Sequence, residues 1–185
     1  MNLFEEISRY IPCCEQEERD KVQMLDFIKK NPEDYLLRDN LLGHFSASAW
    51  VVNKDRTKVL MIYHNLYASW SWTGGHADGM EDMKTVAMKE LREETGVKHA
   101  QFVRDDIFSL ETLTVDGHVK KGVYVPSHLH FNITYLIEAS EEDELFIKPD
   151  ENQGVKWFTL QEVETAPTEQ WMIEHIYKKL LQKKM

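Results

Sequence analysis

Apolar residues near the start of the chain recur at the spacing of a helix. A stripe from Leu3 to Ile11 predicts a helix that ends at Pro12, and residues 15–30 predict a second one. The leucines between residues 35 and 42 predict a short third helical segment. We therefore expect residues 1–42 to form a helical extension, which is either a cap on the following domain or part of a dimer contact or substrate pocket.

From residue 45 onward the pattern changes to short runs typical of strands. Residues 45–53 and 58–64 flank a turn and predict a hairpin, and residues 101–115 and 127–137 predict further strands, the last one central. Part of the second run is apolar at every position, which is typical of a sheet covered on both faces. Strands and helices together predict an α/β fold for residues 43–185.

The second half of the chain carries weaker signals. Asp116-Gly117 is typical of a hairpin turn, and residues 118–125 are expected to be a loop or an edge strand. Within that segment Lys120 and Lys121 are candidate phosphate contacts. Thr168 predicts the N-cap of a final helix.

The most distinctive stretch runs from Gly74 to Val97. Its helix-forming residues predict a helix over about residues 82–95, which Gly96 ends in a left-handed conformation. Three carboxylates fall on one face near the C-terminal end of that helix: Glu90, Glu93 and Glu94. They repel one another and oppose the helix dipole, so we expect a hard divalent cation to neutralise them. The alternative is a solvated acidic face.

The spacing within this stretch carries a family resemblance. The Nudix box is written G-x5-E-x7-R-E-U-x-E-E-x-G-U, with U aliphatic, and the chain resembles it at Gly75, Glu81, Lys89-Glu90-Leu91, Glu93-Glu94 and Gly96-Val97. Every fixed position matches except Lys89, where the family has arginine. Because arginine can hold a carboxylate bidentately and lysine cannot, we expect a looser contact there but a working site.

The resemblance implies a Nudix-type α/β/α sandwich with a mixed sheet. It also implies a hydrolase that cleaves a nucleoside diphosphate linked to another moiety and uses Mg²⁺ or Mn²⁺. Glu93 and Glu94 would be the main metal ligands, and Glu90 a further ligand or the group that takes a proton from water. Glu81 and Lys89 would pair and fix the loop against the helix.

Two further residues are candidate metal ligands by the same resemblance. The carbonyl of Gly74 would complete the coordination shell. Many Nudix chains also place an acidic residue shortly before a tryptophan-containing strand near their end. Glu151 precedes such a strand, which contains Trp157, and is the expected ligand or base, with Asp150 as the alternative.

Substrate contacts are expected beside the box. Trp72 leads into it and is a candidate for stacking on a base, although large aromatic residues are usually core. His76 lies in the adjoining loop and is a candidate phosphate contact. His128 and His130 share one face of the predicted central strand and are expected to face substrate. Zinc ligation by this pair is the weaker alternative, because no third ligand has an obvious spacing.

Composition narrows the class of protein. The 185 residues are 42% apolar and 29% charged, which indicates a globular chain, and the net charge of −10 argues against a general nucleic-acid binder. Cys13 and Cys14 are adjacent and form no disulfide framework. Without a signal-peptide pattern or a long apolar run, we expect a reduced cytoplasmic protein that acts on a small nucleotide-type substrate away from membranes.

Two other functions are compatible with parts of the sequence. A Nudix domain that binds a nucleotide as a sensor without turnover would be favoured by loss of the box glutamates, which are intact here. An isomerase of isoprenoid diphosphates shares the fold but uses a cysteine near the domain core. The cysteines of this chain lie in the N-terminal extension instead. The sequence favours the hydrolase and leaves its substrate open.

Overall fold

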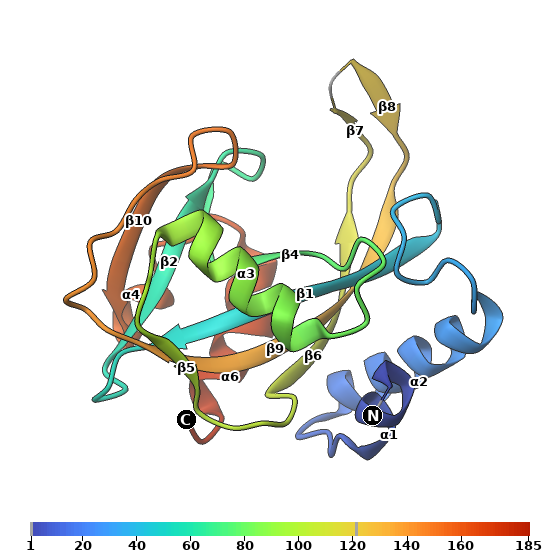
Figure 1. Ribbon diagram of the computed structural model, residues 1–185, viewed down its shortest axis with the longest axis horizontal. Coiled ribbons are helices and arrows are strands. Elements are labelled where there is room, and N and C mark those ends of the chain that lie inside the picture. The colour runs from blue at the N-terminus through green and yellow to red at the C-terminus, as the bar shows by residue number, and fades with distance from the viewer. Residues whose placement is uncertain (1, 121) are drawn as a thin grey trace.

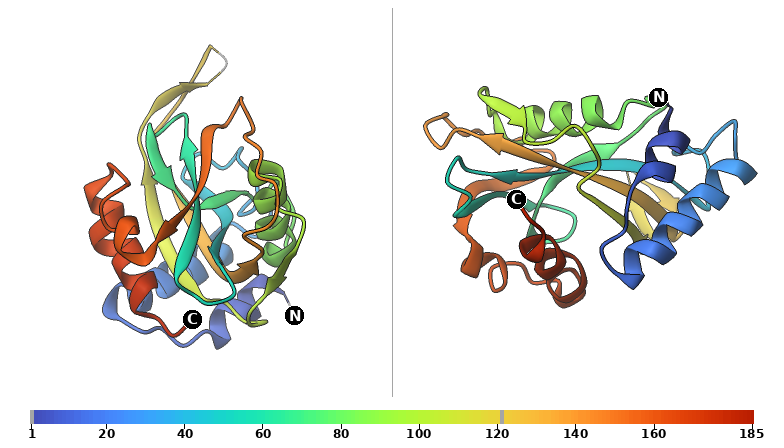
Figure 2. Two further views of the ribbon diagram at one scale, coloured as in Figure 1. Left: turned by 90° about the vertical axis from the view of Figure 1, so that its left-hand side faces the viewer. Right: turned by 90° about the horizontal axis from the view of Figure 1, so that it is seen from below.

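A mixed sheet lies between two helical layers in the computed structural model, which describes residues 2–120 and 122–185 (Figure 1). Helix α3 covers one face, and the C-terminal helical segment covers the other, as the view from below shows (Figure 2). The helical elements are α1 (Leu3–Arg9), α2 (Glu15–Lys30), α3 (Met83–Thr95), α4 (Leu160–Val163), α5 (Gln170–Met172), a π-helical turn (Ile173–Tyr177) and α6 (Lys178–Gln182). This is the α/β sandwich expected from the sequence.

The sheet is built around one parallel pair of long strands. The described strands are β1 (Gly43–Val52), β2 (Lys58–His64), β3 (Ser69–Ser71), β4 (Thr73–His76), β5 (Ala100–Phe102), β6 (Ser109–Val115), β7 (His118–Lys120), β8 (Val123–Val125), β9 (His128–Ala139) and β10 (Asn152–Thr159). The main order is β10-β2-β1-β9-β5, with β3 on β2, β4 on β1 and β6 on β9. Strands β1 and β9 are parallel and the other strand pairs among the described residues are antiparallel, so the sheet is mixed.

Side chains alternate between the two faces of β1 and anchor a helical layer on each side. Val51 packs with Leu91 of α3 in one apolar cluster. Trp50 packs with Tyr177 and Leu180 in the cluster beneath the C-terminal segment. All of β1 is buried, so the alternation of polar and apolar residues over 44–49 does not mark a solvent-exposed face.

The N-terminal extension shares a core with the sheet. Leu3 and Ile7 of α1 and Phe27 of α2 are buried in the same cluster as Phe131 of β9. The predicted third helix is wrong, because residues 31–42 form successive turns. Asparagine and aspartate side chains bond one another there, as in Asn40 Nδ2 to Asp34 Oδ1 at 3.0 Å, and such contacts compete with helical hydrogen bonding.

Three other local predictions differ from the structure. The run 101–115 splits into β5 and β6. Asp116-Gly117 makes no hairpin turn: the chain passes them into β7, which pairs with β8 in a projecting ribbon (Figure 1). The N-cap of the last helix is Glu169, because Thr168 donates its amide to Ser69 Oγ at 2.9 Å. Of the candidate lysines in the ribbon, Lys121 and the side chain of Lys120 lie outside the described part of the chain.

A buried ion cluster ties the extension to the C-terminal segment. Glu17 of α2 is fully buried and accepts hydrogen bonds from Tyr10 at 2.6 Å and Ser109 at 2.8 Å. Lys183 Nζ lies 2.6 Å from Glu17 Oε1, and Lys179 Nζ lies 3.4 Å from the same oxygen. Burial opposes the charged carboxylate, but the hydrogen bonds from Lys183 and Tyr10 outweigh it and lower the pKa of Glu17 to about 2.

In the described part of the chain, no helix has both the length and the apolar character that crossing a bilayer requires.

Replacing Lys183 with methionine should destabilise the fold. The change leaves the more distant Lys179 as the remaining cation beside the buried Glu17 carboxylate. We therefore expect the free energy of unfolding to fall by about 3 kcal/mol, which is near the lower end of the cost of breaking a buried ion pair. Urea denaturation measures it, and Lys184→Met, at an exposed neighbour, is the control. Equal stability of the two variants would contradict the assignment of this ion pair.

Candidate functional site

Helix α3 begins and ends where the sequence predicts. Asp82 is its N-cap and accepts a hydrogen bond from the Thr85 amide at 3.1 Å. Gly96 ends it with a φ of 77°, a left-handed conformation that glycine adopts without strain. The three box glutamates therefore lie in the last turns of the helix. Glu94 faces inward with 2% exposure, whereas the Glu93 side chain is largely open to solvent.

The glycine pair that opens the box is packed between β1 and α3. Strand β4 pairs with β1 so that Gly74 lies opposite Ser48 and His76 lies opposite Ser46, and the expectation that His76 lies in a loop is therefore wrong. A β-carbon on Gly74 would lie 2.5 Å from Ser48 Oγ, and one on Gly75 would lie 2.5 Å from Glu90 Cδ. Any side chain at either position would therefore push the loop away from its neighbours. The absence of side chains lets backbone groups reach the glutamates.

The Glu94 side chain is held by a backbone amide of β4 rather than by a charged partner. Its Oε2 accepts a hydrogen bond from the Gly74 amide at 3.0 Å. Burial raises the pKa of Glu94 to about 8, and the negative charges of Glu90 and Glu151 add to the effect. The Gly74 amide and Lys148 oppose it less strongly. A buried carboxylate beside other carboxylates is an environment that a bound cation would stabilise.

The segment before β10 brings Glu151 to the same place. Asn152 is fully buried and donates from Nδ2 to the carbonyl of Glu94 at 2.9 Å, which ties this segment to the end of α3. Lys148 Nζ lies 3.4 Å from Glu93 and 3.0 Å from Glu151, so its ammonium group bridges two carboxylates. The structure therefore gathers the four predicted carboxylate ligands: Glu90, Glu93, Glu94 and Glu151.

The predicted pair between Glu81 and Lys89 does not form. Lys89 Nζ lies 3.2 Å from Glu90 and 3.6 Å from Glu93, its neighbour one helical turn on. Glu81 precedes α3 and turns toward the extension, where it accepts hydrogen bonds from the Leu3 amide at 3.2 Å and the Tyr35 hydroxyl at 3.3 Å. The loop is thus fixed by the extension, and Lys89 balances charge at the site.

The donors at this site fit a hard divalent cation. Carboxylate oxygens are the ligands that Mg²⁺ and Mn²⁺ prefer, and the partly open rim at Glu93 and Glu151 leaves room for water or phosphate oxygens. Gly74 gives its amide to Glu94, and the role of its carbonyl as a ligand stays a prediction.

The histidines expected to contact substrate lie against one another. The ring of His130 is 4.8 Å from that of His76 and 5.0 Å from that of His128, between ring centroids. His44, which the sequence did not single out, completes the group at 4.9 Å from His130. Burial lowers the pKa of His44 to about 4 and that of His130 to about 2, with the neighbouring imidazoles adding to each shift.

Trp72 occupies a core position. It is 8% exposed, and its ring packs edge-on against Tyr177 at 5.9 Å, beneath the C-terminal segment. The structure therefore does not support its predicted role in stacking on a base. Arg38 was missed by the sequence analysis: it pairs with Asp78 at 2.6 Å, and the charges of Glu90 and Glu151 act on it.

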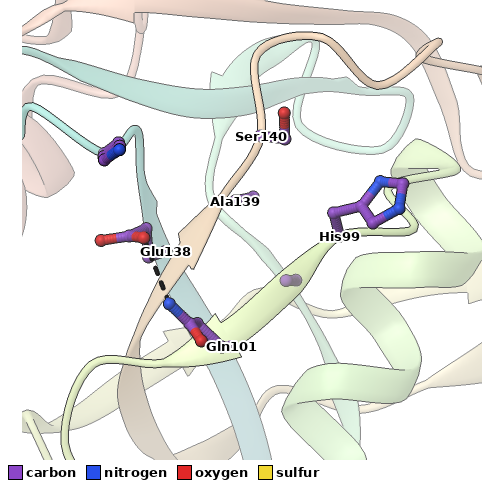
Figure 3. A pocket seen from close by; sticks show the side chains of 7 residues that line it. His99, Gln101, Glu138, Ala139 and Ser140 are labelled. Atoms are coloured by element: carbon purple, nitrogen blue, oxygen red, sulfur yellow. Dashed lines mark hydrogen bonds between the residues drawn. The ribbon is translucent and has the colours of Figure 1, made fainter.

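A separate pocket of about 390 Å³ lies at another edge of the sheet (Figure 3). It is lined by His99, Gln101 and Glu138, and by four further residues: Lys54, Ala100, Ala139 and Ser140. Gln101 donates to Glu138 across it at 3.2 Å. None of the clustered carboxylates lines this pocket, so it is not the candidate active site.

Comparisons with known proteins all point to one family. The NUDIX domain family matches residues 43–180. A curated relative, the RNA pyrophosphohydrolase of Pelagibacter ubique (strain HTCC1062), is 27% identical over 137 residues, covering 72% of this chain and 85% of its own.

Solved structures show the same fold. A NUDIX-family hydrolase from Clostridium perfringens superposes with a TM-score of 0.53 at 19% identity, over 74% of this chain and 95% of that one. The Ap4A hydrolase of C. elegans gives 0.52 at 19% identity, over 74% and 92%. Because the family match spans most of the chain and includes the whole glutamate motif, the chain belongs to the Nudix hydrolase family.

Proposed function

We propose that this protein is a divalent-metal-dependent pyrophosphohydrolase that cleaves a diphosphate linkage in a nucleotide-type substrate. The observation that carries the proposal is the buried carboxylate of Glu94, which has a backbone amide as its hydrogen-bond donor and three further carboxylates nearby. The relatives named above as an RNA pyrophosphohydrolase and an Ap4A hydrolase support the reaction class, because the substrates in their names contain phosphoanhydride bonds.

Glu93, Glu94, Glu90 and Glu151 would hold Mg²⁺ or Mn²⁺, together with the Gly74 carbonyl. When bound, such an ion neutralises phosphate charge and lowers the pKa of a coordinated water. The residues of the chain do the remaining work. Gly74 fixes Glu94 through its amide, and Asn152 fixes the end of α3.

Three side chains are placed to move a proton or to hold phosphate. Glu90 lies against Gly75, with a side chain 13% exposed, and is the candidate acceptor for the proton of the attacking water when it is not a ligand. Arg38 and Lys148 are the nearby cations that can attract substrate phosphates. Arg38 belongs to the extension, so we propose that residues 1–42 complete the site of the catalytic domain, residues 43–185.

The reaction can be tested with a substrate panel. Purified protein with Mg²⁺ should release a nucleoside monophosphate or a shortened nucleotide from one class among ADP-ribose, nucleoside triphosphates, dinucleoside polyphosphates, nucleotide sugars and 5′-triphosphorylated RNA. Chromatography scores the products, and excess chelator should abolish them. Nucleotide binding in a thermal-shift assay without turnover of any class would contradict the hydrolase and favour a sensor.

Changing Glu94 to glutamine should cost about 10²-fold or more in kcat on the active substrate. The amide keeps the size of the side chain and its acceptor for the Gly74 amide but removes the charge, and loss of one charge-stabilising group costs about that much. Glu142→Gln, in an exposed loop, is the matched control. Full Mg²⁺-dependent activity in Glu94→Gln would show that the ligand assignment is wrong.

A further inference from the structure

Strand pairing brings four histidines together at one end of the sheet. The parallel register of β1 and β9 places His44 directly beside His130, and His128 lies two residues before His130 on the same face. Strand β4 ends at His76, which lies opposite Ser46 of β1. The four rings therefore come from three adjacent strands, on backbone that the sheet already holds rigid.

The imidazole nitrogens in this group converge. His44, His76 and His130 each offer a ring nitrogen, and these three atoms all lie within 4.8 Å of one another. His44 is 4% exposed, and neither of its ring nitrogens has a hydrogen-bond partner with good geometry; the backbone of Asn40 lies close enough only to favour the protonated ring slightly. A buried polar group without a partner costs roughly 1–3 kcal/mol, so a ligand at this point would remove an existing penalty.

His128 is oriented in the way of a metal-binding histidine. Its Nδ1 lies 2.9 Å from the carbonyl oxygen of Pro126. Because a carbonyl oxygen can only accept a hydrogen bond, Nδ1 carries the hydrogen and Nε2 of the neutral ring carries the lone pair. That Nε2 lies 3.2 Å from Nε2 of His130. Two imidazole ligands of a tetrahedral zinc ion, with Zn–N of about 2.1 Å, have nitrogens about 3.4 Å apart.

We propose that His44, His76 and His130 bind a divalent transition-metal ion of the Zn²⁺ class, with His128 as the adjoining fourth imidazole. Neutral imidazoles prefer such ions to Mg²⁺, whereas the carboxylate site prefers Mg²⁺ to such ions. The proposal does not rest on the hydrolase reaction, because it uses different ligands and a different ion. The ion would brace the ends of β1, β4 and β9 beside the glycine loop.

Charges around the histidines are balanced. The positive charge of Arg38 disfavours a cation at His44 and His130. Arg38 is ion-paired with Asp78, however, and the negative charge of Asp78 favours a cation at His44. The other described group with three close candidate ligands is Cys13, Cys14 and Glu17. There the carboxylate of Glu17 is already ion-paired with Lys183 at 2.6 Å, so it is not available to a metal ion.

Calorimetric titration of metal-free protein with Zn²⁺, in excess Mg²⁺, tests the site. A Cys13→Ser/Cys14→Ser background removes binding by thiols. We expect one Zn²⁺ per chain and a rise in Tm on binding. His130→Ala and His76→Gln should each weaken the affinity by about 100-fold or more, because loss of an outer-shell partner alone costs roughly 10–100-fold.

His175→Ala is the matched control, since this exposed histidine packs against Trp171, outside the cluster. Glu94→Gln should also keep Zn²⁺ binding. Circular dichroism confirms that each variant is folded, and His76→Gln provides a second test if His130→Ala unfolds. No Zn²⁺ binding by the wild-type chain, or unchanged binding in both cluster variants, would overturn the proposal. Loss of binding in Glu94→Gln alone would assign the ion to the carboxylates.

Discussion

The close packing of the Gly74–Gly75 backbone between β1 and α3 is the constraint on which the site depends. A side chain at Gly74 would overlap Ser48, and one at Gly75 would overlap Glu90. This part of β4 therefore lies close to both β1 and α3 only because its two glycines have no side chains. This contact places the Gly74 amide on Glu94. It also places His76 at the end of β4, near His44 and His130. One loop thus joins the carboxylate cluster to the histidine cluster.

The two clusters differ in donor chemistry, and the fold keeps them apart. The carboxylates come from the end of α3 and from the segment before β10, on the helical side of the glycine loop. The histidines come from the ends of the central strands. Oxygen donors suit a hard ion that keeps part of its water shell, and imidazoles suit a more firmly held transition metal. Arg38, from the extension, acts electrostatically on both clusters.

Local patterns predicted the parts of the structure that local physics determines. Helix α2 and strand β2 have the predicted bounds, and α3 lies within one residue of its predicted bounds and ends at the predicted glycine, because periodicity and capping are properties of short segments. Motif spacing singled out Glu90, Glu93 and Glu94, and the position before the Trp157 strand singled out Glu151; the structure brings these four carboxylates together. The turns over residues 31–42 are held by contacts between asparagine and aspartate side chains, which apolar periodicity does not report. The ribbon pairs β7 with β8, so its turn lies beyond the Asp116-Gly117 position that the sequence favoured. The place of His44 beside His130 follows from the register of two strands far apart in sequence.

The central claim is that the carboxylates at the end of α3 bind a divalent cation, and Mn²⁺ titration followed by electron paramagnetic resonance tests it directly. Wild-type protein should bind Mn²⁺, and Glu94→Gln should weaken that binding by about tenfold or more, which corresponds to roughly 1.4 kcal/mol. His130→Ala and the exposed-loop variant Glu144→Gln should bind as the wild type does. Equal Mn²⁺ affinity in Glu94→Gln and the wild type would contradict the account.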